Sequence, residues 1–344
     1  GALDPLICYA MKANPNLALL EVFVEEGTGF DIVSGGELAR AVTAGADPAK
    51  IVFSGVGKSV DEMTAALSAG VLMFNVESEE ELEVLAATAS EHGRKAGIAL
   101  RVNPDVDPKT HRYITTGKRE SKFGVDLERA TALAERAFEL PSIELRGIQC
   151  HIGSQITTVE PYVAAVARTV ELALALRERA DTLRYLNMGG GFGIYYDDAH
   201  VPALVDYAEA LAPLLEGTGL RLVMEPGRVI VGNAGVLLTR VQFNKASGDK
   251  RFVIVDAGMN DLIRPSLYQG VHRIWPVEGP PPPAPGESPD EPACDVVGPV
   301  CETGDFLARG RNLPRVQRGD LMAVFSAGAY AMSMTSNYND QVRP

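Results

Sequence analysis

Scarce residue types limit what this chain can be. Its 344 residues include only four cysteines, Cys8, Cys150, Cys294 and Cys301, and no pair has the spacing of zinc ligands or of a secreted disulfide framework. We therefore expect no metal site and a reducing, cytoplasmic environment. No apolar run approaches the roughly 18 residues of a membrane helix, and no basic-then-apolar signal segment opens the chain.

Positive charge is scarce as well. The 32 Lys and Arg residues are outnumbered by 45 Asp and Glu residues, which gives a formal net charge of −13. An acidic chain is a poor match for nucleic acid or for an anionic membrane surface, so we expect neither as a partner. The chain is rich in hydrophobic residues, at 46%. This is typical of a soluble globular protein with length for two domains or one large one.

The first two thirds of the chain alternate between strand and helix patterns. The predicted strands are 6–11, 30–33, 51–53, 71–76, 98–102, 147–151, 185–188 and 222–225. The predicted helices between them are 17–26, 37–44, 60–69, 79–92, 127–140, 162–180 and 203–215. Eight strands separated by helices predict an α/β fold, either a (β/α)8 TIM-type barrel or an open doubly wound sheet, and the number eight favours the barrel.

Long helical patterns disappear after Gly227. The strands predicted there are 230–238, 239–245, 252–256, 296–300 and 321–325. We expect a (β/α)8 barrel in residues 1–233 and a β-rich, barrel-like or sandwich-like domain in 234–344. Residues 276–292 are Pro-rich and predict an extended, solvated segment, with a ligand for a proline-binding module as the less favoured interpretation. The chain has no initiator Met and begins almost within its first strand, so we expect residues to be missing at both ends.

Reactive side chains follow the predicted strands at their carboxyl ends, which is where (β/α) barrels carry their chemistry. Lys12 ends the first strand, and Pro15 prevents that strand from continuing. A lysine placed there can form a Schiff base with an aldehyde if its pKa is lowered, although a solvated lysine is the simpler interpretation. His151 and Ser154 follow the sixth strand, and Glu225 ends the eighth.

A glycine run follows the seventh strand and consists of Gly189, Gly190, Gly191 and Gly193. The residues after it do not open a helix, so the run is not a dinucleotide fingerprint. Consecutive glycines can direct several backbone N–H groups at one anion, and the loops after strands seven and eight of barrels recurrently bind phosphate. We therefore expect a phosphate site here, with a flexible turn as the alternative.

These features together suit one ligand. The flat ring of His151 could stack on an aromatic cofactor, although most single histidines are packed or solvated residues. A carboxylate such as Glu225 is costly to bury unless it has a partner, and a protonated ring nitrogen would be one. Lys12 suits an aldehyde, and the glycine run suits a phosphate. The sequence therefore predicts pyridoxal 5′-phosphate as the cofactor.

The β-rich region adds three polar clusters. Arg264 and Tyr268 lie in NDLIRPSLY, Cys301 and Glu302 in GPVCETGD, and Tyr330 in FSAGAYAMS. Each of these residues could simply lie on a surface loop, and a cysteine is more often a small buried hydrophobe. A cysteine beside a glutamate in a turn bounded by Gly and Pro is nevertheless poorly explained by core packing.

Nine ordered motifs resemble those of the pyridoxal-phosphate decarboxylases of the alanine-racemase fold group, most closely the diaminopimelate decarboxylase family. They include YAMKAN, FDIVSGGE, HIGSQ, GGGFG, EPGR and CETGD. The resemblance implies that Lys12 is the Schiff-base lysine and that Cys301 is the proton donor. The cofactor ligands that it implies are Lys12, His151, Ser154, Gly190, Gly191, Gly193, Glu225, Gly227, Arg228 and Tyr330. The substrate ligands that it implies are Arg228, Arg264, Tyr268, Glu302 and Tyr330.

The resemblance also implies an activity and an assembly. The expected reaction is decarboxylation of meso-2,6-diaminopimelate to L-lysine, and the expected assembly is a homodimer in which the Cys301 loop reaches the partner's site. Another basic amino-acid decarboxylase, for ornithine, arginine or lysine, is the main alternative. Glu225 speaks against a racemase, and the motifs around Cys301 speak against a mere cofactor carrier. Residues 109–122 are interpreted equally well as a solvated connection or as a lid over the site.

Overall fold

The computed structural model describes residues 4–107, 122–196, 201–280 and 292–344. These residues form two compact units. One comprises the described residues of Gly1–Gly193 and Val201–Gly227, and the other comprises those of Ile194–His200 and Arg228–Pro344. The boundary between residues 233 and 234 stays a prediction. No helix within the described residues is long and apolar enough to cross a membrane.

The first unit is a closed parallel barrel. Its strands are β1 (Leu6–Ala10), β2 (Gly29–Ile32), β3 (Ile51–Phe53), β4 (Met73–Val76), β5 (Ala96–Asn103), β6 (Val125–Asp126), β7 (Ile143–Cys150), β8 (Tyr185–Asn187) and β9 (Arg221–Met224). They follow one another in the order β1-β2-β3-β4-β5-β7-β8-β9, and β9 pairs with β1. The short strand β6 is added to the side of β5. The predicted (β/α)8 barrel is confirmed, and an open sheet is excluded.

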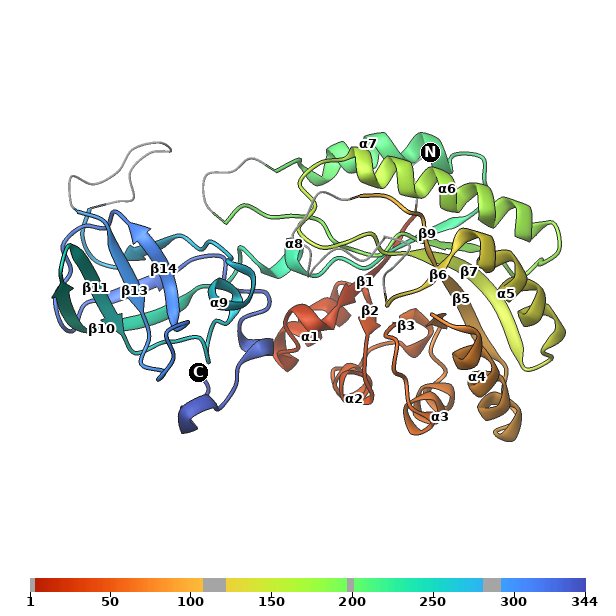
Figure 1. Ribbon diagram of the computed structural model, residues 1–344. Coiled ribbons are helices and arrows are strands. Elements are labelled where there is room, and N and C mark those ends of the chain that lie inside the picture. The colour runs from red at the N-terminus through yellow and green to blue at the C-terminus, as the bar shows by residue number, and fades with distance from the viewer. Residues whose placement is uncertain (1–3, 108–121, 197–200, 281–291) are drawn as a thin grey trace. The chain divides into compact units, whose positions relative to one another are not determined.

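Within the described part of this unit, seven α-helices accompany these strands and lie outside them in Figure 1. They are α1 (Leu17–Glu25), α2 (Gly35–Thr43), α3 (Val60–Ala69), α4 (Glu79–Glu91), α5 (Leu127–Glu139), α6 (Glu160–Arg177) and α7 (Leu204–Leu215). Serine side chains begin three of them: the hydroxyls of Ser34, Ser59 and Ser78 accept hydrogen bonds from backbone N–H groups in the first turns of α2, α3 and α4. Such caps contribute about 1 kcal/mol each and fix the loops at the carboxyl ends of β2, β3 and β4.

The second unit is built on a six-stranded sheet. Its strands are β10 (Leu237–Ser247), β11 (Lys250–Val255), β12 (Ile274–Pro276), β13 (Cys294–Val297), β14 (Phe306–Arg311) and β15 (Leu321–Val324), in the order β12-β15-β10-β11-β13-β14. The pairs are antiparallel except for β11 with β13. A core that includes Val241, Leu262 and Met322 supports the sheet. The prediction of a β-rich second domain is confirmed.

Among its described residues, this unit also contains the short α-helices α8 (Arg228–Val231) and α9 (Arg264–Tyr268). The strand predicted at 230–238 is therefore wrong in its first part, because Arg228–Val231 forms a helical turn and β10 begins only at Leu237. The strands predicted at 230–238 and 239–245 merge into one long strand. The predictions for 109–122 and for the Pro-rich stretch 276–292 fall mostly on residues 108–121 and 281–291, which lie outside the described residues.

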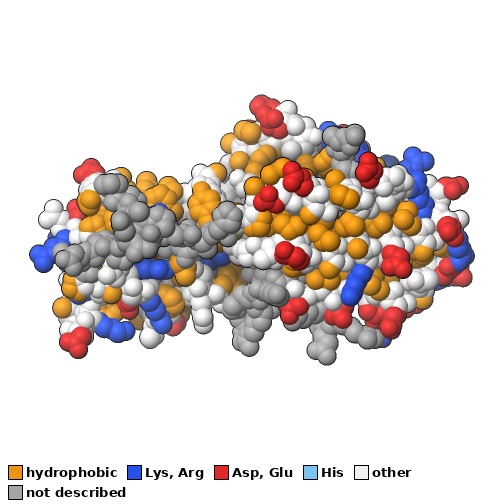
Figure 2. Space-filling model, turned by 90° about the horizontal axis from the view of Figure 1, so that it is seen from above, with side chains coloured by type: hydrophobic (Ala, Val, Ile, Leu, Met, Phe, Trp, Pro, Cys, Tyr) orange, Lys and Arg blue, Asp and Glu red, His pale blue; other side chains and the backbone are white. Residues whose placement is uncertain are grey.

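Charged side chains are dispersed over the face that Figure 2 shows. The face shown in Figure 2 carries Asp and Glu side chains scattered among hydrophobic and neutral ones, and its described Lys and Arg side chains do not merge into a continuous patch.

Candidate active site

The amine of Lys12 lies at the carboxyl end of β1, in the short 3-10 turn Met11–Ala13. Its Nζ is 2.7 Å from the Oδ2 of Asp31, which lies on the neighbouring strand β2. The Asp31 side chain is fully buried, whereas the Lys12 side chain is 39% exposed. The ion pair therefore anchors the amine to the barrel while leaving it accessible for reaction.

Glu225 follows β9 directly and is held by amide side chains from three strands. Its Oε1 accepts hydrogen bonds from Asn187 Nδ2 at 2.6 Å and Asn75 Nδ2 at 3.0 Å, and its Oε2 lies 3.4 Å from Gln149 Nε2. Burial raises the pKa of the Glu225 carboxyl to about 7, helped by the nearby charge of Asp31. A carboxyl with a pKa near neutrality can share a proton with a basic ring nitrogen.

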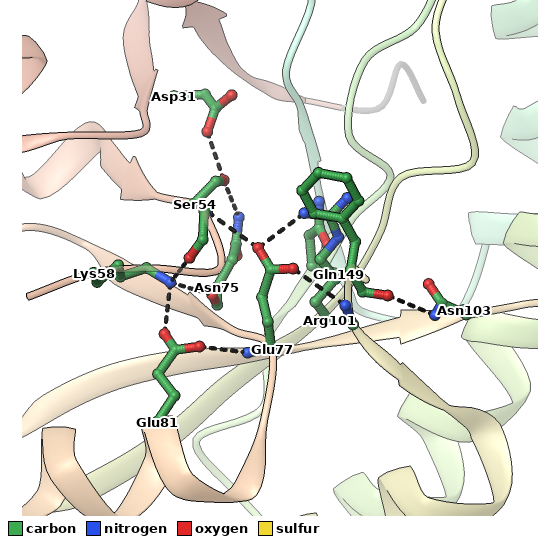
Figure 3. Close-up of polar contacts among 12 residues, drawn as sticks. Asp31, Ser54, Lys58, Asn75, Glu77, Glu81, Arg101, Asn103 and Gln149 are labelled. Atoms are coloured by element: carbon green, nitrogen blue, oxygen red, sulfur yellow. Dashed lines mark hydrogen bonds and ion pairs between the residues drawn. The ribbon is translucent and has the colours of Figure 1, made fainter. Parts of the chain in front are cut away.

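A chain of hydrogen bonds joins Asp31, the partner of Lys12, to Glu225. Ser54 Oγ donates to Asp31 Oδ1 at 2.6 Å, and Asn75 Nδ2 lies 2.8 Å from Ser54 Oγ and 3.0 Å from Glu225 Oε1. Figure 3 shows Asp31, Ser54 and Asn75 along this line, with Gln149 to one side. Because β4 and β9 are not neighbours in the barrel order, the contact from Asn75 to Glu225 spans the barrel interior. The amine and the carboxyl are therefore held within one connected network.

Two buried ion pairs support this network from the side of β4, as Figure 3 also shows. Glu77 Oε1 is 2.9 Å from Arg101 Nη1, and Glu81 Oε1 is 2.6 Å from Lys58 Nζ. Lys58 Nζ also donates to the backbone carbonyl of Asn75 at 2.8 Å. Loss of one partner would leave a buried charge uncompensated, at a cost of roughly 3–5 kcal/mol. The backbone that carries Asn75 is thereby kept rigid.

His151 follows β7 and contacts the glycine loop, because its Nδ1 lies 3.3 Å from the backbone N of Gly190. Burial lowers the pKa of His151 well below its usual value, and the positive charges of Arg101 and Lys12 lower it further. The imidazole is therefore neutral, and its Nδ1 accepts the Gly190 N–H. Ser154 lies three residues further on, in the same loop.

The glycine loop is crowded by backbone from other strands. A Cβ on Gly190 would lie 2.0 Å from the carbonyl oxygen of Glu225, and one on Gly191 would lie 2.1 Å from that of Gly153. Gly191 also has a φ of +102°. Side chains are excluded at Gly190 and Gly191, so these two positions can meet a ligand only with their backbone. Gly227 lies close to the same place, with its Cβ position 3.1 Å from those of Ala10 and Ala13.

The barrel residues fit the predicted cofactor. Two buried acceptors lie near the Glu225 carboxyl, namely the Oδ1 of Asn75 and the Oε1 of Gln149. Neither of these two atoms has a hydrogen-bond partner among the described residues. A protonated ring nitrogen beside Glu225 would supply the missing positive charge. The Lys12 amine and the glycine loop then offer an attachment point for an aldehyde and a backbone surface for a phosphate.

In the second unit, the predicted ligands Arg228, Arg264 and Tyr330 form one cluster around Tyr196. The guanidinium carbon of Arg264 lies 4.2 Å from the Tyr196 ring centroid, and that of Arg228 lies 4.6 Å from the Tyr330 ring. Arg228 Nη1 also contacts the Tyr196 hydroxyl. Both arginines are buried. Burial lowers the pKa of Arg264 to about 10, and the charge of Arg228 acts in the same direction. Tyr268 lies at the end of α9, the helix that Arg264 begins.

Cys301 and Glu302 lie together on an exposed turn. The backbone N of Cys301 donates to Asn339 Oδ1 at 2.7 Å, and the Glu302 carboxylate accepts a hydrogen bond from Tyr338. The N–H of the preceding residue donates to Asp305 at 2.6 Å. The thiol of Cys301 is exposed, so a role in core packing is excluded.

Several residues of the site escaped the sequence-based prediction. Asp31, Asn75, Gln149 and Asn187 each lie in or at the end of an otherwise apolar strand and are buried. A single polar residue within an apolar strand near its carboxyl end is the signal that would have found them. Glu37 was also missed; burial raises its pKa to about 7, and the charge of Lys12 opposes that rise.

Comparison with known proteins places these observations among relatives. The family model described as "Pyridoxal-dependent decarboxylase, pyridoxal binding domain" matches residues 2–232. The chain is 52% identical to diaminopimelate decarboxylase of Aquifex aeolicus over 341 residues, which is 99% of this chain and 80% of that relative. The crystal structure of diaminopimelate decarboxylase from Helicobacter pylori complexed with L-lysine matches with a TM-score of 0.93 at 42% identity, over 98% of this chain and 83% of that one. The arginine decarboxylase of Paramecium bursaria Chlorella virus, at 23% identity and a TM-score of 0.84 over 97% of this chain and 87% of that one, shares the fold.

Proposed function

The chain belongs to the diaminopimelate decarboxylases, within the pyridoxal-dependent decarboxylase family, and we propose that it removes one carboxylate of meso-2,6-diaminopimelate to release L-lysine. It is a carboxy-lyase that uses pyridoxal phosphate and acts on a small molecule, and its product places it in lysine biosynthesis. The identity of 52% to a diaminopimelate decarboxylase carries this conclusion. The alternative is another basic amino-acid decarboxylase, for ornithine, arginine or lysine; the arginine decarboxylase at 23% identity shares the fold and supports nothing beyond it.

The proposal gives the barrel residues the task of holding the cofactor. Lys12 would bind its aldehyde, Glu225 its ring nitrogen and His151 one face of its ring. The phosphate would be held by Ser154, Gly190, Gly191, Gly193, Gly227 and Arg228, with Tyr330 as a further contact. Bound pyridoxal phosphate supplies an electron sink for the electron pair that remains when carbon dioxide leaves. Glu225 would deepen that sink, because a negatively charged carboxylate beside the ring nitrogen favours the protonated form of that nitrogen.

Lys12 would have a second task, because its amine must also be held when the substrate's amine, and not its own, is bound to the aldehyde of the cofactor. The Asp31 carboxylate, 2.7 Å from Nζ, would stabilise the lysine side chain as an ammonium. The Lys12 amine would thus keep a fixed position both when it holds the cofactor and when the substrate has taken its place. The connected hydrogen bonds through Ser54 and Asn75 prevent Asp31 from turning away.

In the second unit, the proposal assigns substrate recognition to Arg228, Arg264, Tyr268, Glu302 and Tyr330. The end of diaminopimelate that does not react carries a carboxylate and an amine. The buried guanidinium groups of Arg228 and Arg264 suit the carboxylate, and the exposed carboxylate of Glu302 suits the amine. Cys301 would donate the proton that replaces carbon dioxide, because its exposed thiol can act as a general acid.

We further propose a homodimer with shared active sites, located in the cytoplasm. The exposure of Cys301 and Glu302 supports the first part, because a proton donor on an exposed turn can serve a neighbouring subunit. All four cysteines are free thiols, as a reducing compartment requires. Mixing the inactive variants Lys12→Ala and Cys301→Ala tests the sharing: hybrid dimers should regain activity at one site. Two inactive variants that stay inactive after subunit exchange would exclude it.

Carbon dioxide release from several substrates tests the activity itself. With pyridoxal phosphate bound, the protein should act on meso-diaminopimelate and leave ornithine, arginine and lysine almost untouched. A preference for one of these three would select the alternative decarboxylase. Conversion of one diaminopimelate stereoisomer into another without loss of carbon dioxide would identify a racemase.

A further inference from the structure

His272 lies between α9 and β12 and is 1% exposed. Its Nδ1 lies 2.8 Å from the carbonyl oxygen of Phe325, and its Nε2 lies 2.7 Å from Arg264 Nη1. A carbonyl oxygen can only accept a hydrogen bond, and a guanidinium can only donate one. The imidazole must therefore carry its proton on Nδ1 and accept the Arg264 N–H at Nε2.

Among the residues that the structure describes, no ion pair joins Arg264 to a carboxylate, and its hydrogen-bond partner His272 is neutral. Burial lowers the pKa of Arg264 most, and the described groups that shift it further are Tyr196, Arg228, Tyr268 and Tyr330, none of which is a carboxylate. The residue is 6% exposed, and its Nε has no hydrogen-bond partner among the described residues. The guanidinium lies against the face of Tyr196, while the edge of that ring packs on His272, with ring centroids 4.9 Å apart at 72°. Arg264 is thus oriented by a neutral acceptor and an aromatic ring.

We propose that His272 is a positioning residue, which holds Arg264 by a neutral hydrogen bond and so keeps its full positive charge and its remaining N–H groups for the carboxylate of the substrate. This inference rests on the proposed function. A carboxylate in place of His272 would also hold the guanidinium, but it would neutralise it and compete with the ligand. An imidazole accepts the same N–H and contributes no negative charge.

The imidazole also stays neutral in this position. Burial lowers the pKa of His272 to about 4, and the charges of Arg264 and Arg228 act in the same direction, although the Phe325 carbonyl opposes them. A protonated ring would lose the acceptor at Nε2 and would place a second cation 2.7 Å from Arg264. The hydrogen bond to Arg264 is therefore present throughout the neutral pH range.

Three substitutions separate the effects of a neutral acceptor, of a negative charge and of side-chain volume at position 272. His272→Gln keeps a neutral acceptor oxygen, His272→Glu keeps an acceptor but adds a negative charge, and His272→Leu removes the acceptor at similar volume. L-lysine retains one carboxylate, whereas 1,5-diaminopentane has the same two amines and none. The ratio of their dissociation constants, measured by calorimetry with the pyridoxal-phosphate form of the protein, therefore reports the hold of Arg264 on a carboxylate. Melting temperature and cofactor absorbance serve as controls for folding.

We expect the glutamine variant to keep the preference for L-lysine within about threefold of the unsubstituted protein. The leucine and glutamate variants should lose about tenfold or more of it, because a charge-assisted contact is misplaced or neutralised. KM for diaminopimelate should rise in the same order, and kcat should change less. If the leucine variant fails to fold, the glutamine and glutamate pair decides.

Equal preferences in the glutamine and glutamate variants, or a leucine variant that binds both ligands as the unsubstituted protein does, would overturn the proposal. So would a loss of thermal stability accompanied by an unchanged ratio of dissociation constants. The proposed function fails separately, if the unsubstituted protein releases no carbon dioxide from diaminopimelate. The ratio of the two dissociation constants is measured without turnover, so it tests the role of His272 whether or not the protein decarboxylates diaminopimelate.

Discussion

Replacing Gly191 with alanine adds one methyl group at a place that has no room for it. The new Cβ would lie 2.1 Å from the carbonyl oxygen of Gly153 and 2.9 Å from the Tyr162 hydroxyl, whereas real Cβ atoms essentially never approach closer than 3.0 Å. The backbone must therefore move by about 1 Å (3.0 minus 2.1). The glycine loop proposed to hold the cofactor phosphate moves with it.

The cost of Gly191→Ala can be worked from the same contacts. An alanine at positive φ costs about 1–2 kcal/mol. The shift also weakens two hydrogen bonds, from the Tyr162 hydroxyl to Gly190 O at 2.8 Å and from Ile156 N to Gly191 O at 2.9 Å, each of which contributes about 1 kcal/mol. The sum of about 3–4 kcal/mol should lower the melting temperature by roughly 10 °C. Affinity for pyridoxal phosphate should fall by about tenfold or more.

Gly217→Ala is the matched control. Gly217 also has a positive φ, +75°, but nothing lies within 4 Å of its Cβ position. This variant should lose only about 1–2 kcal/mol, or roughly 5 °C, with unchanged cofactor affinity. The assay is calorimetry of the cofactor-free protein, followed by titration with pyridoxal phosphate at its absorbance bands. Equal losses in the two variants would refute the crowding argument, and normal cofactor affinity in Gly191→Ala would refute the role of the loop.

Three further predictions concern the reacting groups. In the cofactor-free protein, Glu225 binds its proton more tightly when folded, so stability should fall as pH rises from about 4.5 to about 7; Glu225→Gln should remove roughly 3 kcal/mol of that fall, measured by urea unfolding. The same slope in both proteins would contradict it. Lys12→Ala should abolish the absorbance band of the lysine-linked cofactor, and a persisting band refutes its role. Cys301→Ala should lower turnover by about 10²–10⁴-fold with little change in cofactor affinity; equal losses would mark it as structural.

The barrel could be predicted because strand and helix patterns alternate, and each pattern is local. The helical turn of Arg228–Val231 was missed because a short apolar run has no distinguishing period, and tertiary packing decides its conformation. The side strand β6 has only two residues, Val125 and Asp126, which is too short for any pattern.

The residues of the candidate site also fall into those that local sequence can indicate and those that only the folded chain brings together. Lys12, His151 and Glu225 could be proposed as candidates because they end predicted strands, which is a property of the local sequence. Asn75 was not found, because its partner Glu225 is 150 residues away along the chain and only closure of the barrel brings them together. His272 was missed for a similar reason: its tautomer and its task depend on Phe325 and Arg264, and only the folded second unit brings these three residues into contact.

The hydrogen bonds from Asp31 to Glu225 also have a consequence for how the barrel assembles. Hydrophobic strands that are buried on both sides tolerate sliding past one another by two residues, because the same faces stay buried. Here such a slip would leave Asp31 or Asn75 in an apolar interior without its hydrogen-bond partners. Each buried polar group without a partner costs several kcal/mol. The hydrogen-bond network of the candidate site therefore stabilises only the correct register of the strands. A barrel with a shifted register would lose stability as well as activity.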